Sequence, residues 1–440
     1  MTRYRSKPDT LAEWLTYFEQ THPKSIELGL ERVNQVKNQL KLEPLFPIIV
    51  VGGTNGKGSV CAILEAILTC AGFRVGCYTS PHFLRYNERV RIARREVDDI
   101  DLCEAFGKVE TARRNSGISL TYFEYGTLAA MLLFMRAKVD IAILEVGLGG
   151  RLDAVNVFDA DCAILTSIGL DHMDYLGVTR EEIGFEKAGI FRAGKTAICA
   201  ETNAPATINQ QAEKIGANFL QIGEDFGYLT EQKRWHFWGS EGKRHCLPYP
   251  ALRGSIQLNN ASACLAALDV LEEHLPVSMS DIRDGLLDVL LPGRFQIFSS
   301  QPLVIMDVAH NPDAAHVLAD NLDAMQSYRH TYAVFAMLRD KDIIGVVKAL
   351  KHCVDVWLIS TIHVPRGAHA NELLEILNEA GISETNKAIH VFSDPVGAYG
   401  YACEHATNND RICVLGSFYT VSAILQNQWA IKRQGQNQVL

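Results

Sequence analysis

The sequence lacks the features that mark nucleic-acid-binding, membrane and secreted proteins. Its net charge of -9 gives no general attraction to nucleic acid or to anionic lipid surfaces. No apolar run reaches the length of a membrane span, and the N-terminus MTRYRSKPDTLAEWL has no apolar stretch of signal-peptide length. We therefore expect a cytoplasmic protein with neither nucleic-acid nor membrane partners.

Cys-x-x-Cys pairs are also absent, although the chain contains 11 cysteines. An odd number of cysteines without metal-site spacing indicates reduced, mostly buried thiols and not a disulfide framework. This cysteine usage is typical of a cytoplasmic protein as well.

Core-forming residues, in contrast, are abundant. Hydrophobic residues make up 48% of the sequence and charged residues 21%, as in a globular enzyme, and a length of 440 residues favours two domains. Strand-like runs alternate with helix-like runs such as 59–70 and 125–136, which predicts an α/β fold with a doubly wound, mostly parallel sheet. The strands expected in the first domain span 47–51, 74–79, 140–146, 162–167 and 196–200.

The alternation breaks between about residue 203 and residue 250, where short aromatic and charged pieces look like hairpins or a peripheral extension without an assignable role. A helix is expected over 257–271, and LPGRFQ at 291–296 marks a domain boundary. We predict a phosphate-loop-containing domain over 1–297 and a smaller, Rossmann-like α/β domain over 298–440. Its expected strands span 303–308, 332–337, 354–360, 388–392 and 411–415.

A phosphate-binding loop is predicted by residues 46–59, which read FPIIVVGGTNGKGS. A buried strand leads into a glycine-rich turn and then a helix, whose free N–H groups and positive dipole end would face an anion. Lys57 adds a positive charge, and Ser59 offers a hydroxyl to a magnesium ion. The spacing departs from G-x-x-x-x-G-K-[ST], because Val51 stands at the first glycine position and Gly58 separates Lys57 from Ser59. The alternative is a plain glycine turn that binds nothing.

Polar residues follow several predicted strands, at the edge where ligands of parallel sheets bind. Ser80, Glu145 and His172 would hold a second divalent ion there, and Asp307 opens the second domain. Alternatively, Glu145 caps the sheet and His172 is a hydrogen-bonded structural histidine.

Eight motifs of this sequence, in this order, resemble bacterial bifunctional dihydrofolate synthase/folylpolyglutamate synthase, a family of the Mur ligase superfamily. They are VGGTNGKGS, SPHFLRYNERV, LTYFEYGTLA, LEVGLGGRLDAVN, SIGLDHMDYLG, EKAGIF, LPGRFQ and DVAHNP, and the resemblance runs from about Ser25 to the end of the chain. It implies a Mur-type central domain that binds ATP and pterin, followed by a C-terminal glutamate ligase domain.

The resemblance also implies a reaction and its partners. The enzyme would join L-glutamate to 7,8-dihydropteroate and add further glutamates to reduced folates, with ATP as co-substrate and Mg²⁺ at two sites. ATP would convert the acceptor carboxylate to an acyl phosphate that the glutamate amine attacks, so catalysis is positioning and charge neutralisation. A monomer is expected.

Site residues follow from the resemblance, position by position. Lys57, His172 and Lys187 would be catalytic, with Lys187 carbamylated; without the resemblance, Lys187 reads as a surface salt-bridge lysine and Arg294 as a boundary salt bridge. One magnesium ion would contact Ser59, and the other would contact Ser80, Glu145 and His172. ATP would contact Thr54, Asn55, Gly56, Lys57, Gly58, Ser59, Asn260, Arg294, Asp307 and His310, in a cleft between the domains that closure assembles.

The pterin substrate would lie against three stretches of the first domain. Tyr122 and Phe123 could stack on the flat pterin ring, or they could be plain core at a helix start. The matching positions are Glu27, Leu28, Gly29, Leu30, Thr121, Tyr122, Phe123, Glu124, Leu152, Asp153 and Ala154.

Three other functions stay open. A single-activity folylpolyglutamate synthase would share most of these motifs. A ligase of cell-wall precursors would need an N-terminal uridine-nucleotide domain, and only about 45 residues precede the phosphate loop. A regulatory or transport NTPase would need no carboxylate substrate, and the chain has no guanine-specific Asn-Lys-x-Asp.

Overall fold

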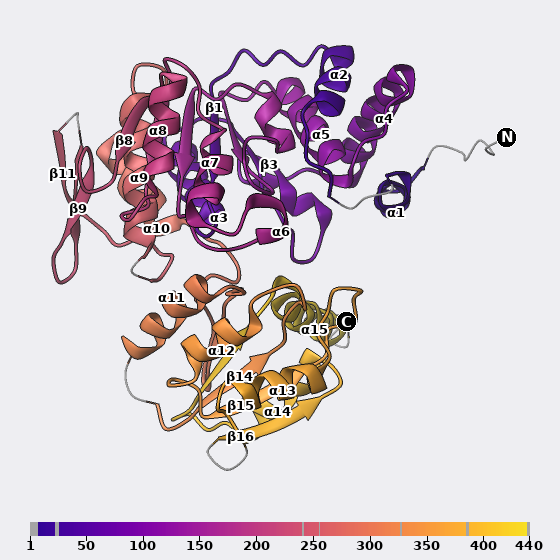
Figure 1. The fold of residues 1–440 in the computed structure, drawn as a ribbon, viewed down its shortest axis with the longest axis vertical. Helices are drawn as coiled ribbons and strands as arrows, with labels where there is room; N and C mark the ends of the chain where they lie inside the picture. The colour runs from indigo at the N-terminus through magenta and orange to yellow at the C-terminus, as the bar shows by residue number, and fades with distance from the viewer. Residues whose placement is uncertain are drawn as a thin grey trace. The chain divides into compact units, whose positions relative to one another are not determined.

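A computed structural model describes residues 8–22, 26–239, 242–254, 256–325, 328–383 and 387–437 (Figure 1). The chain forms two compact units. The first unit comprises Met1–Ala251 and Leu258–Val289, and the second comprises Leu252–Gln257 and Leu290–Leu440.

The first unit is built on an eight-stranded sheet with the strand order β4-β3-β2-β5-β1-β6-β7-β8. All neighbouring pairs from β2 to β8 are parallel, and only β3 and β4 pair antiparallel. The strands are β1 (Ile48–Gly52), β2 (Val75–Tyr78), β3 (Val90–Ile92), β4 (Arg95–Glu96), β5 (Ile141–Glu145), β6 (Cys162–Leu165), β7 (Thr196–Cys199) and β8 (Asn218–Gln221). The predicted doubly wound α/β fold and its five strands are confirmed, while the short strands β3, β4 and β8 were not predicted.

Helices pack on both faces of this sheet, which is why β1, β2, β5 and β6 are buried along their whole length. The helices of this unit are α1 (Leu11–Thr21), α2 (Glu31–Leu40), α3 (Lys57–Cys70), α4 (Asp99–Ser116), α5 (Tyr122–Ala137), α6 (Met173–Leu176), α7 (Arg180–Ala188), α8 (Ala206–Ile215), α9 (Ile256–Val270) and α10 (Met279–Asp288). Helix α3, directly after β1, is buried from Gly58 to Leu68 and forms the centre of the unit.

A second, three-stranded antiparallel sheet belongs to the same unit. It consists of β9 (Gly227–Thr230), β10 (Trp235–Gly239) and β11 (Gly242–Leu247), with β10 in the middle. The expected hairpins are therefore present, whereas α8 and β8 in the same segment were not predicted.

The second unit has a six-stranded sheet with the order β12-β13-β17-β14-β15-β16, in which only β12 is antiparallel. Its strands are β12 (Gln296–Ser300), β13 (Leu303–Met306), β14 (Thr331–Phe335), β15 (Val356–Ser360), β16 (Ala388–Phe392) and β17 (Arg411–Leu415). Its helices are α11 (Pro312–Asp323), α12 (Ile343–Leu350), α13 (Ala370–Glu379), α14 (Pro395–His405) and α15 (Phe418–Asn437). Residues 290–297 lie in this unit and not in the first, because β12 hydrogen-bonds to β13.

None of the helices in the described ranges combines the length and the apolar character that crossing a bilayer requires.

The carboxylate of Glu110 on α4 connects three helices of the first unit. It accepts hydrogen bonds from Tyr17 of α1 (2.8 Å), from Tyr125 of α5, from Arg113 (Nε, 2.8 Å) and from Arg114. Burial alone would raise the pKa of Glu110, but these four donors outweigh it and lower the pKa to about 2. The carboxylate is therefore ionised throughout the physiological range.

We expect Glu110→Gln to lower the free energy of unfolding by about 2–4 kcal/mol, because the arginine and tyrosine donors that converge on this buried position lose their charged acceptor. The difference from wild type should be full above the ordinary glutamate pKa of 4.5 and should fade as the pH falls towards 2. Urea unfolding followed by circular dichroism at several pH values measures it.

Glu104→Gln, on the same helix, is the matched control, because the Glu104 side chain is 57% exposed in its ion pair with Arg136. An equal loss of stability in both variants would contradict the special role of Glu110.

Candidate active site

The predicted phosphate loop joins β1 to α3, in the expected order of strand, glycine turn and helix. Gly53 (φ +141°) and Gly56 (φ +90°) adopt backbone conformations that favour glycine. A β-carbon on Gly53 would lie 1.9 Å from Oγ1 of Thr166, so the turn excludes any other residue there. Helix α3 begins at Lys57, which places Gly58 and Ser59 in its first turn.

The loop is held from the side by the residues that follow β6. The backbone N–H of Thr54 donates to Ser167 O (2.8 Å), and that of Asn55 donates to Ser167 Oγ (2.9 Å). Thr166 Oγ1 in turn donates to Asn55 O (2.6 Å). Sequence reasoning missed Thr166 and Ser167 as contacts of the loop, and their only signal is their place at the end of the strand predicted over 162–167, beyond Leu165 where β6 ends.

Two lysines share one carbonyl oxygen of this loop. Lys57 Nζ and Lys187 Nζ each donate to Gly53 O at 3.0 Å, and Lys57 Nζ also donates to Thr54 O at 3.1 Å. Lys187 is only 4% exposed. Its burial, and next the charge of Lys57, lower its pKa from 10.5 to about 7. The reading of Lys187 as a surface salt-bridge lysine is therefore wrong.

Of the predicted metal ligands, Ser80 and Glu145 lie in contact. Glu145 is buried at the end of β5, and its Oε2 accepts a hydrogen bond from Ser80 N (3.0 Å). The parallel register places Glu145 next to Val51, two residues before the loop glycine Gly53. Ser59 is buried as well, in the first turn of α3. The sheet thus brings an acidic oxygen close to the start of the phosphate loop.

His172 precedes α6 in a left-handed conformation (φ 52°). Its Nε2 lies 3.9 Å from Asp171 Oδ2, and about a third of its side chain is exposed. The imidazole is therefore accessible for a ligand, and Asp171 is a neighbouring carboxylate that sequence reasoning did not select.

The three stretches predicted for the pterin lie together. Gly29 N donates to Leu152 O (3.2 Å), which joins the first stretch to the third. Arg32 Nη2 donates both to Glu27 O and to Glu124 Oε1, each at 2.9 Å, and joins the first stretch to the second. Sequence reasoning missed Arg32, because a charged residue at the start of a helix reads as solvent-exposed.

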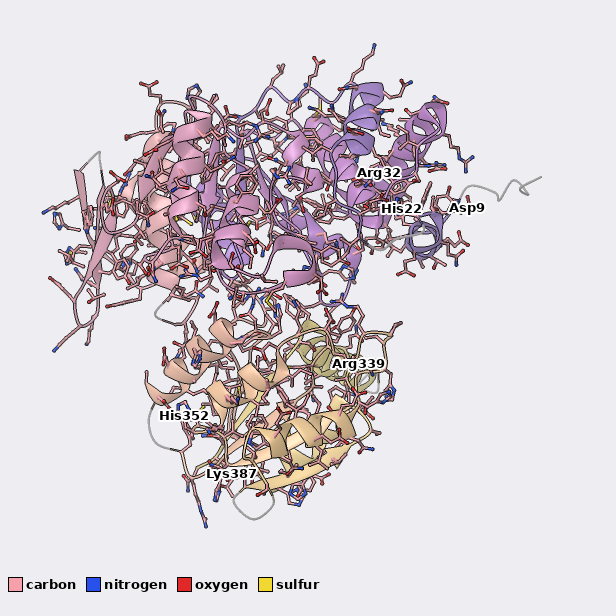
Figure 2. All side chains as sticks on the ribbon, in the orientation of Figure 1. Asp9, His22, Arg32, Arg339, His352 and Lys387 are labelled. Carbon is pink, nitrogen blue, oxygen red and sulfur yellow. The ribbon has the colours of Figure 1, made fainter. Side chains whose placement is uncertain are left out.

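Glu27 also pairs with a histidine from the neighbouring helix end. Its Oε2 lies 2.9 Å from His22 Nε2, and its Oε1 lies 3.6 Å from Arg32 Nη1. Figure 2 labels His22 and Arg32, which lie close to each other near α1. The side chains of His22 and Arg32 thus both hold the carboxylate of Glu27, at the start of the loop.

Tyr122 and Phe123 form the first turn of α5, after a capping box of Thr121 and Glu124. Both rings are half-buried against the core of the unit. The Tyr122 ring packs edge-on against Tyr86 at 5.7 Å, and a β-carbon on Gly147 would lie 2.7 Å from the Phe123 ring. The rings contribute to the core and keep some exposed surface, and stacking on the pterin ring stays a prediction.

Asp153 shapes the loop after β5 from within. Its buried carboxylate accepts from Leu148 N (2.8 Å) and from Val155 N (3.0 Å). Burial raises the pKa of Asp153 to about 7, although these backbone hydrogen bonds and Lys57 oppose the rise. The Asp153 side chain holds the loop in which Leu152 and Ala154 lie.

Three of the predicted nucleotide contacts lie in the second unit. Asp307 follows β13 and accepts from Phe295 N (2.7 Å) and Ala309 N (2.8 Å); burial raises its pKa, and nearby Arg294 opposes this. The Arg294 guanidinium lies 5.4 Å from the centre of the Phe418 ring, and the His310 ring lies 6.4 Å from it. These three predicted residues therefore cluster at one end of the sheet.

Asn260, the fourth predicted contact outside the loop, lies in the first unit on α9. It is 1% exposed, and a β-carbon on Gly56 would lie 2.8 Å from its Oδ1. The side chain thus rests on the phosphate loop itself. The prediction that ATP contacts both domains stays a prediction.

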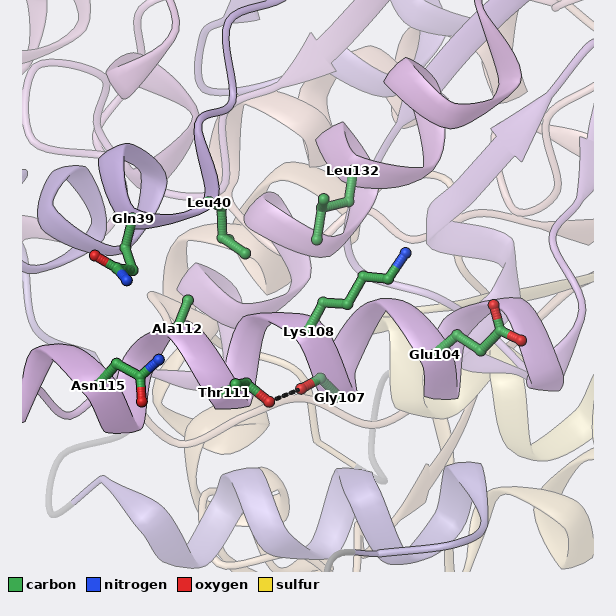
Figure 3. A pocket seen from close by; sticks show the side chains of 9 residues that line it. All are labelled: Gln39, Leu40, Glu104, Gly107, Lys108, Thr111, Ala112, Asn115 and Leu132. Carbon is green, nitrogen blue, oxygen red and sulfur yellow. Dashed lines mark hydrogen bonds between the residues drawn. The ribbon is translucent and has the colours of Figure 1, made fainter.

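A hollow of about 630 Å³ on the first unit is unrelated to these residues (Figure 3). It contains none of the predicted site residues, and Thr111 Oγ1 donates to Gly107 O of its own helix (2.8 Å). The lining residues are Gln39, Leu40, Glu104, Gly107, Lys108, Thr111, Ala112, Asn115 and Leu132.

The second unit contains another group of residues that could bind a metal ion. Donor atoms of Asp323, His352 and Cys353 lie within 4.8 Å of one another there. His352 Nε2 and Asp323 Oδ2 form an exposed ion pair at 3.0 Å. The Cys353 thiol donates to Leu350 O (3.2 Å), and burial raises its pKa to about 11. The cluster is explained as a surface ion pair next to a protonated structural thiol.

Comparison with known proteins assigns the class. The Mur ligase middle domain matches residues 51–268, and the Mur ligase glutamate ligase domain matches residues 293–418. The phosphate loop and the two α/β units are therefore those of a Mur-type ligase.

Similarity to individual proteins identifies the family within the Mur ligases. Dihydrofolate synthase/folylpolyglutamate synthase of Escherichia coli (strain K12) is 45% identical over 417 residues, which cover 94% of this chain and 95% of that protein. The structure of E. coli FolC in complex with DHPP and ADP matches with a TM-score of 0.91 and 44% identity, over 97% of this chain and 100% of that one. A bifunctional enzyme of the same name with Mn, AMPPNP and L-glutamate bound has a TM-score of 0.88 and 44% identity, with the same coverage. The chain belongs to the dihydrofolate synthase/folylpolyglutamate synthase family.

Compared with wild-type protein whose Lys187 amine is free of carbamylation, Lys187→Met should be more stable, and it should be inactive. Because the pKa of Lys187 is lowered to about 7, the native state disfavours the protonated lysine. The gain in the free energy of unfolding, about 2–4 kcal/mol, should be full below pH 7. It should shrink as the pH rises from 7 towards 10.5, because the wild-type lysine is then already neutral in the native state. Urea unfolding between pH 6 and 10 provides the test.

Lys195→Met is the control, because this side chain is 50% exposed in an ion pair with Asp161. A gain without pH dependence in the Lys187 variant would contradict the lowered pKa.

Glu145→Gln should raise the Mg²⁺ concentration for half-maximal turnover by about tenfold or more, because a neutral amide binds the ion more weakly than a carboxylate. The amide oxygen can still accept from Ser80 N, so the fold should persist. A magnesium titration of turnover measures the effect.

Glu201→Gln is the matched control for this titration, since Glu201 follows β7 and likewise accepts a backbone hydrogen bond, from Ile168 N (3.0 Å). An unchanged magnesium requirement in the Glu145 variant would remove that residue from the metal site.

Proposed function

We propose that this protein joins L-glutamate to 7,8-dihydropteroate, giving dihydrofolate, and adds further L-glutamates to tetrahydrofolate, giving folylpolyglutamates. The observation that carries this proposal is the similarity over nearly the whole chain to enzymes whose names state both activities. The phosphate loop with its paired lysines supports the use of ATP as co-substrate.

The reaction needs an activated carboxylate. The γ-phosphoryl group of ATP passes to the substrate carboxylate, giving an acyl phosphate and ADP, and the glutamate amine then displaces phosphate to form the amide. No enzyme nucleophile takes part, so the protein acts by holding the reactants in line and neutralising phosphate charge. We assign this charge neutralisation to the N-terminus of α3 and to the ammonium group of Lys57, which lies in the first turn of that helix.

Magnesium fits the residues proposed to hold it. Ser59 and Ser80 offer hydroxyl oxygens and Glu145 a buried carboxylate, which are the oxygen donors that a hard divalent cation prefers, and His172 adds an accessible imidazole nitrogen. Bound there, Mg²⁺ would neutralise the charge of the transferring phosphoryl group. A related enzyme has been solved with Mn, AMPPNP and L-glutamate bound, which supports the use of a divalent ion together with the nucleotide.

We further propose that Lys187 is carbamylated. A pKa of about 7 leaves much of this amine neutral near neutral pH, and only the neutral amine can attack CO₂. The new N–C bond forms as the amine loses a proton, and the product is an anion next to Lys57. The change replaces repulsion between two ammonium groups with attraction.

The pterin would lie between the loop at Gly29, the start of α5 and the loop at Leu152. Arg32 and the backbone contact between Gly29 and Leu152 hold these three stretches together. Tyr122 and Phe123 would offer an aromatic surface to the flat ring.

We propose the cellular compartment of the protein from the oxidation state of its cysteines. All 11 are free thiols in the structure, which supports a reducing, cytoplasmic compartment. A monomer acting on small molecules only is the simplest assembly and stays a prediction.

Phosphate release from MgATP, with dihydropteroate and L-glutamate omitted in turn, tests the proposal. Release should require both, and mass spectrometry should detect dihydrofolate. Lys57→Ala, which removes phosphate-binding charge but no core volume, should be inactive.

The same assay separates the alternatives. Glutamate addition to tetrahydrofolate but not to dihydropteroate would make the protein a single-activity folylpolyglutamate synthase. Phosphate release that requires neither dihydropteroate nor L-glutamate would overturn the ligase proposal and indicate an NTPase.

A further inference from the structure

The three-stranded sheet of β9, β10 and β11 contains no residue of the proposed active site. Figure 1 shows β9 and β11 at one end of the first unit, next to β8 and α9. Much of the surface of this three-stranded sheet is exposed, and Leu229 on β9 has 62% of its surface accessible. We therefore infer the role of this small sheet from its contacts with the rest of the first unit.

Two polar contacts attach this sheet to α9. The Tyr228 hydroxyl on β9 donates to Asn259 Oδ1 at 3.0 Å, in the first turn of the helix. Arg244 on β11 forms an ion pair with Asp269, whose side chain is 4% exposed, in the last turn. The sheet thus contacts both ends of α9.

Asn259 also forms a hydrogen bond with the main sheet of the first unit. Its Nδ2 donates to Ala200 O, directly after β7, at 3.4 Å, and the residue is 8% exposed. With one amide atom on Ala200 and the other on Tyr228, the side chain has a single hydrogen-bonded orientation. The first turn of α9 is therefore held between β7 and β9.

The next residue on that turn is Asn260, which rests on Gly56 of the phosphate loop. Adjacent residues of a helix share a rigid backbone, so a shift of Asn259 moves Asn260 by a similar amount. Because Asn260 is buried against the loop, even a small shift changes its position relative to a bound nucleotide.

We infer that Tyr228 is a positioning residue for the nucleotide: its hydroxyl, through Asn259, keeps Asn260 in place over the phosphate loop. The inference deepens the proposed function and rests on it, because the nucleotide contact of Asn260 is part of that proposal. It gives the small sheet a role in nucleotide affinity and none in the chemistry of the acceptor carboxylate.

Tyr228→Phe removes only the hydroxyl and keeps the ring that packs against Trp235 at 6.4 Å. The dissociation constant of MgADP, measured by titration calorimetry, should rise about 3- to 10-fold, the size expected for one hydrogen bond. The KM for ATP should rise by a similar factor, while kcat and the KM for dihydropteroate stay within about twofold of wild type.

Tyr249→Phe is the matched control. Its hydroxyl also donates one hydrogen bond, to Glu231 O at 2.8 Å, but both partners belong to the small sheet and its flanks. This variant should bind MgADP like wild type. An equal loss in both variants would mean that stability of the small sheet, and not the bond to Asn259, sets the affinity, and would overturn the inference.

Wild-type affinity for MgADP in Tyr228→Phe would also overturn it. Calorimetry needs no turnover, so the inference can be judged apart from the proposed function. If the protein does not use dihydropteroate but Tyr228→Phe still weakens MgADP binding, the function proposal fails and the positioning role stands.

Discussion

The carbonyl oxygen of Gly53, shared by two lysine ammonium groups, is the interaction on which the candidate site depends. One carbonyl oxygen cannot neutralise two positive charges, and the partly exposed Lys57 lies next to the buried Lys187. Burial and the charge of Lys57 lower the pKa of Lys187 to about 7, so the protonated form of Lys187 is disfavoured. An anion in the loop lowers this repulsion, so the arrangement favours phosphate binding and carbamylation alike. Without such an anion the same pair of charges would only destabilise the fold.

The fold creates this arrangement by bringing distant parts of the chain together. Lys187, a buried residue in the last turn of α7, donates to Gly53 O across 134 residues of sequence. Thr166 and Ser167 hold Asn55 across 111 and 112 residues, because β6 is the parallel neighbour of β1. Parallel order places the carboxyl ends of these strands side by side, and a ligand site at that edge follows.

Local patterns account for what the sequence could predict. Strands β1 and β5 are apolar runs that end in Gly52 and Glu145, and β6 is an apolar run that ends directly before Thr166. The loop after β1 is rich in glycine and contains Lys57, so the strands and the loop could be placed from the sequence. The contacts of Arg32 and Ser167 could not, because each depends on a partner more than 90 residues away. Strand β12 reads QIFSS and is only half-buried, so no strong pattern marks it; its pairing with β13 is what moves residues 290–297 into the second unit.

The unusual spacing of the phosphate motif also has a structural reason. Val51 lies inside β1 and not in the loop, so the absence of glycine there changes nothing in the turn. Thr54 and Asn55 donate their backbone N–H groups to Ser167, and only their side chains can contact a nucleotide. Phosphate binding then depends on the backbone N–H groups from Gly56 onward, at the N-terminus of α3. Gly58 lies in that first turn without a side chain, so an anion can approach the N–H groups there while Lys57 and Ser59 contribute their side chains. Under the proposed function, the short loop therefore shifts the anion site from the turn onto the helix, and the position of Asn260 over Gly56 would help to determine where the nucleotide lies.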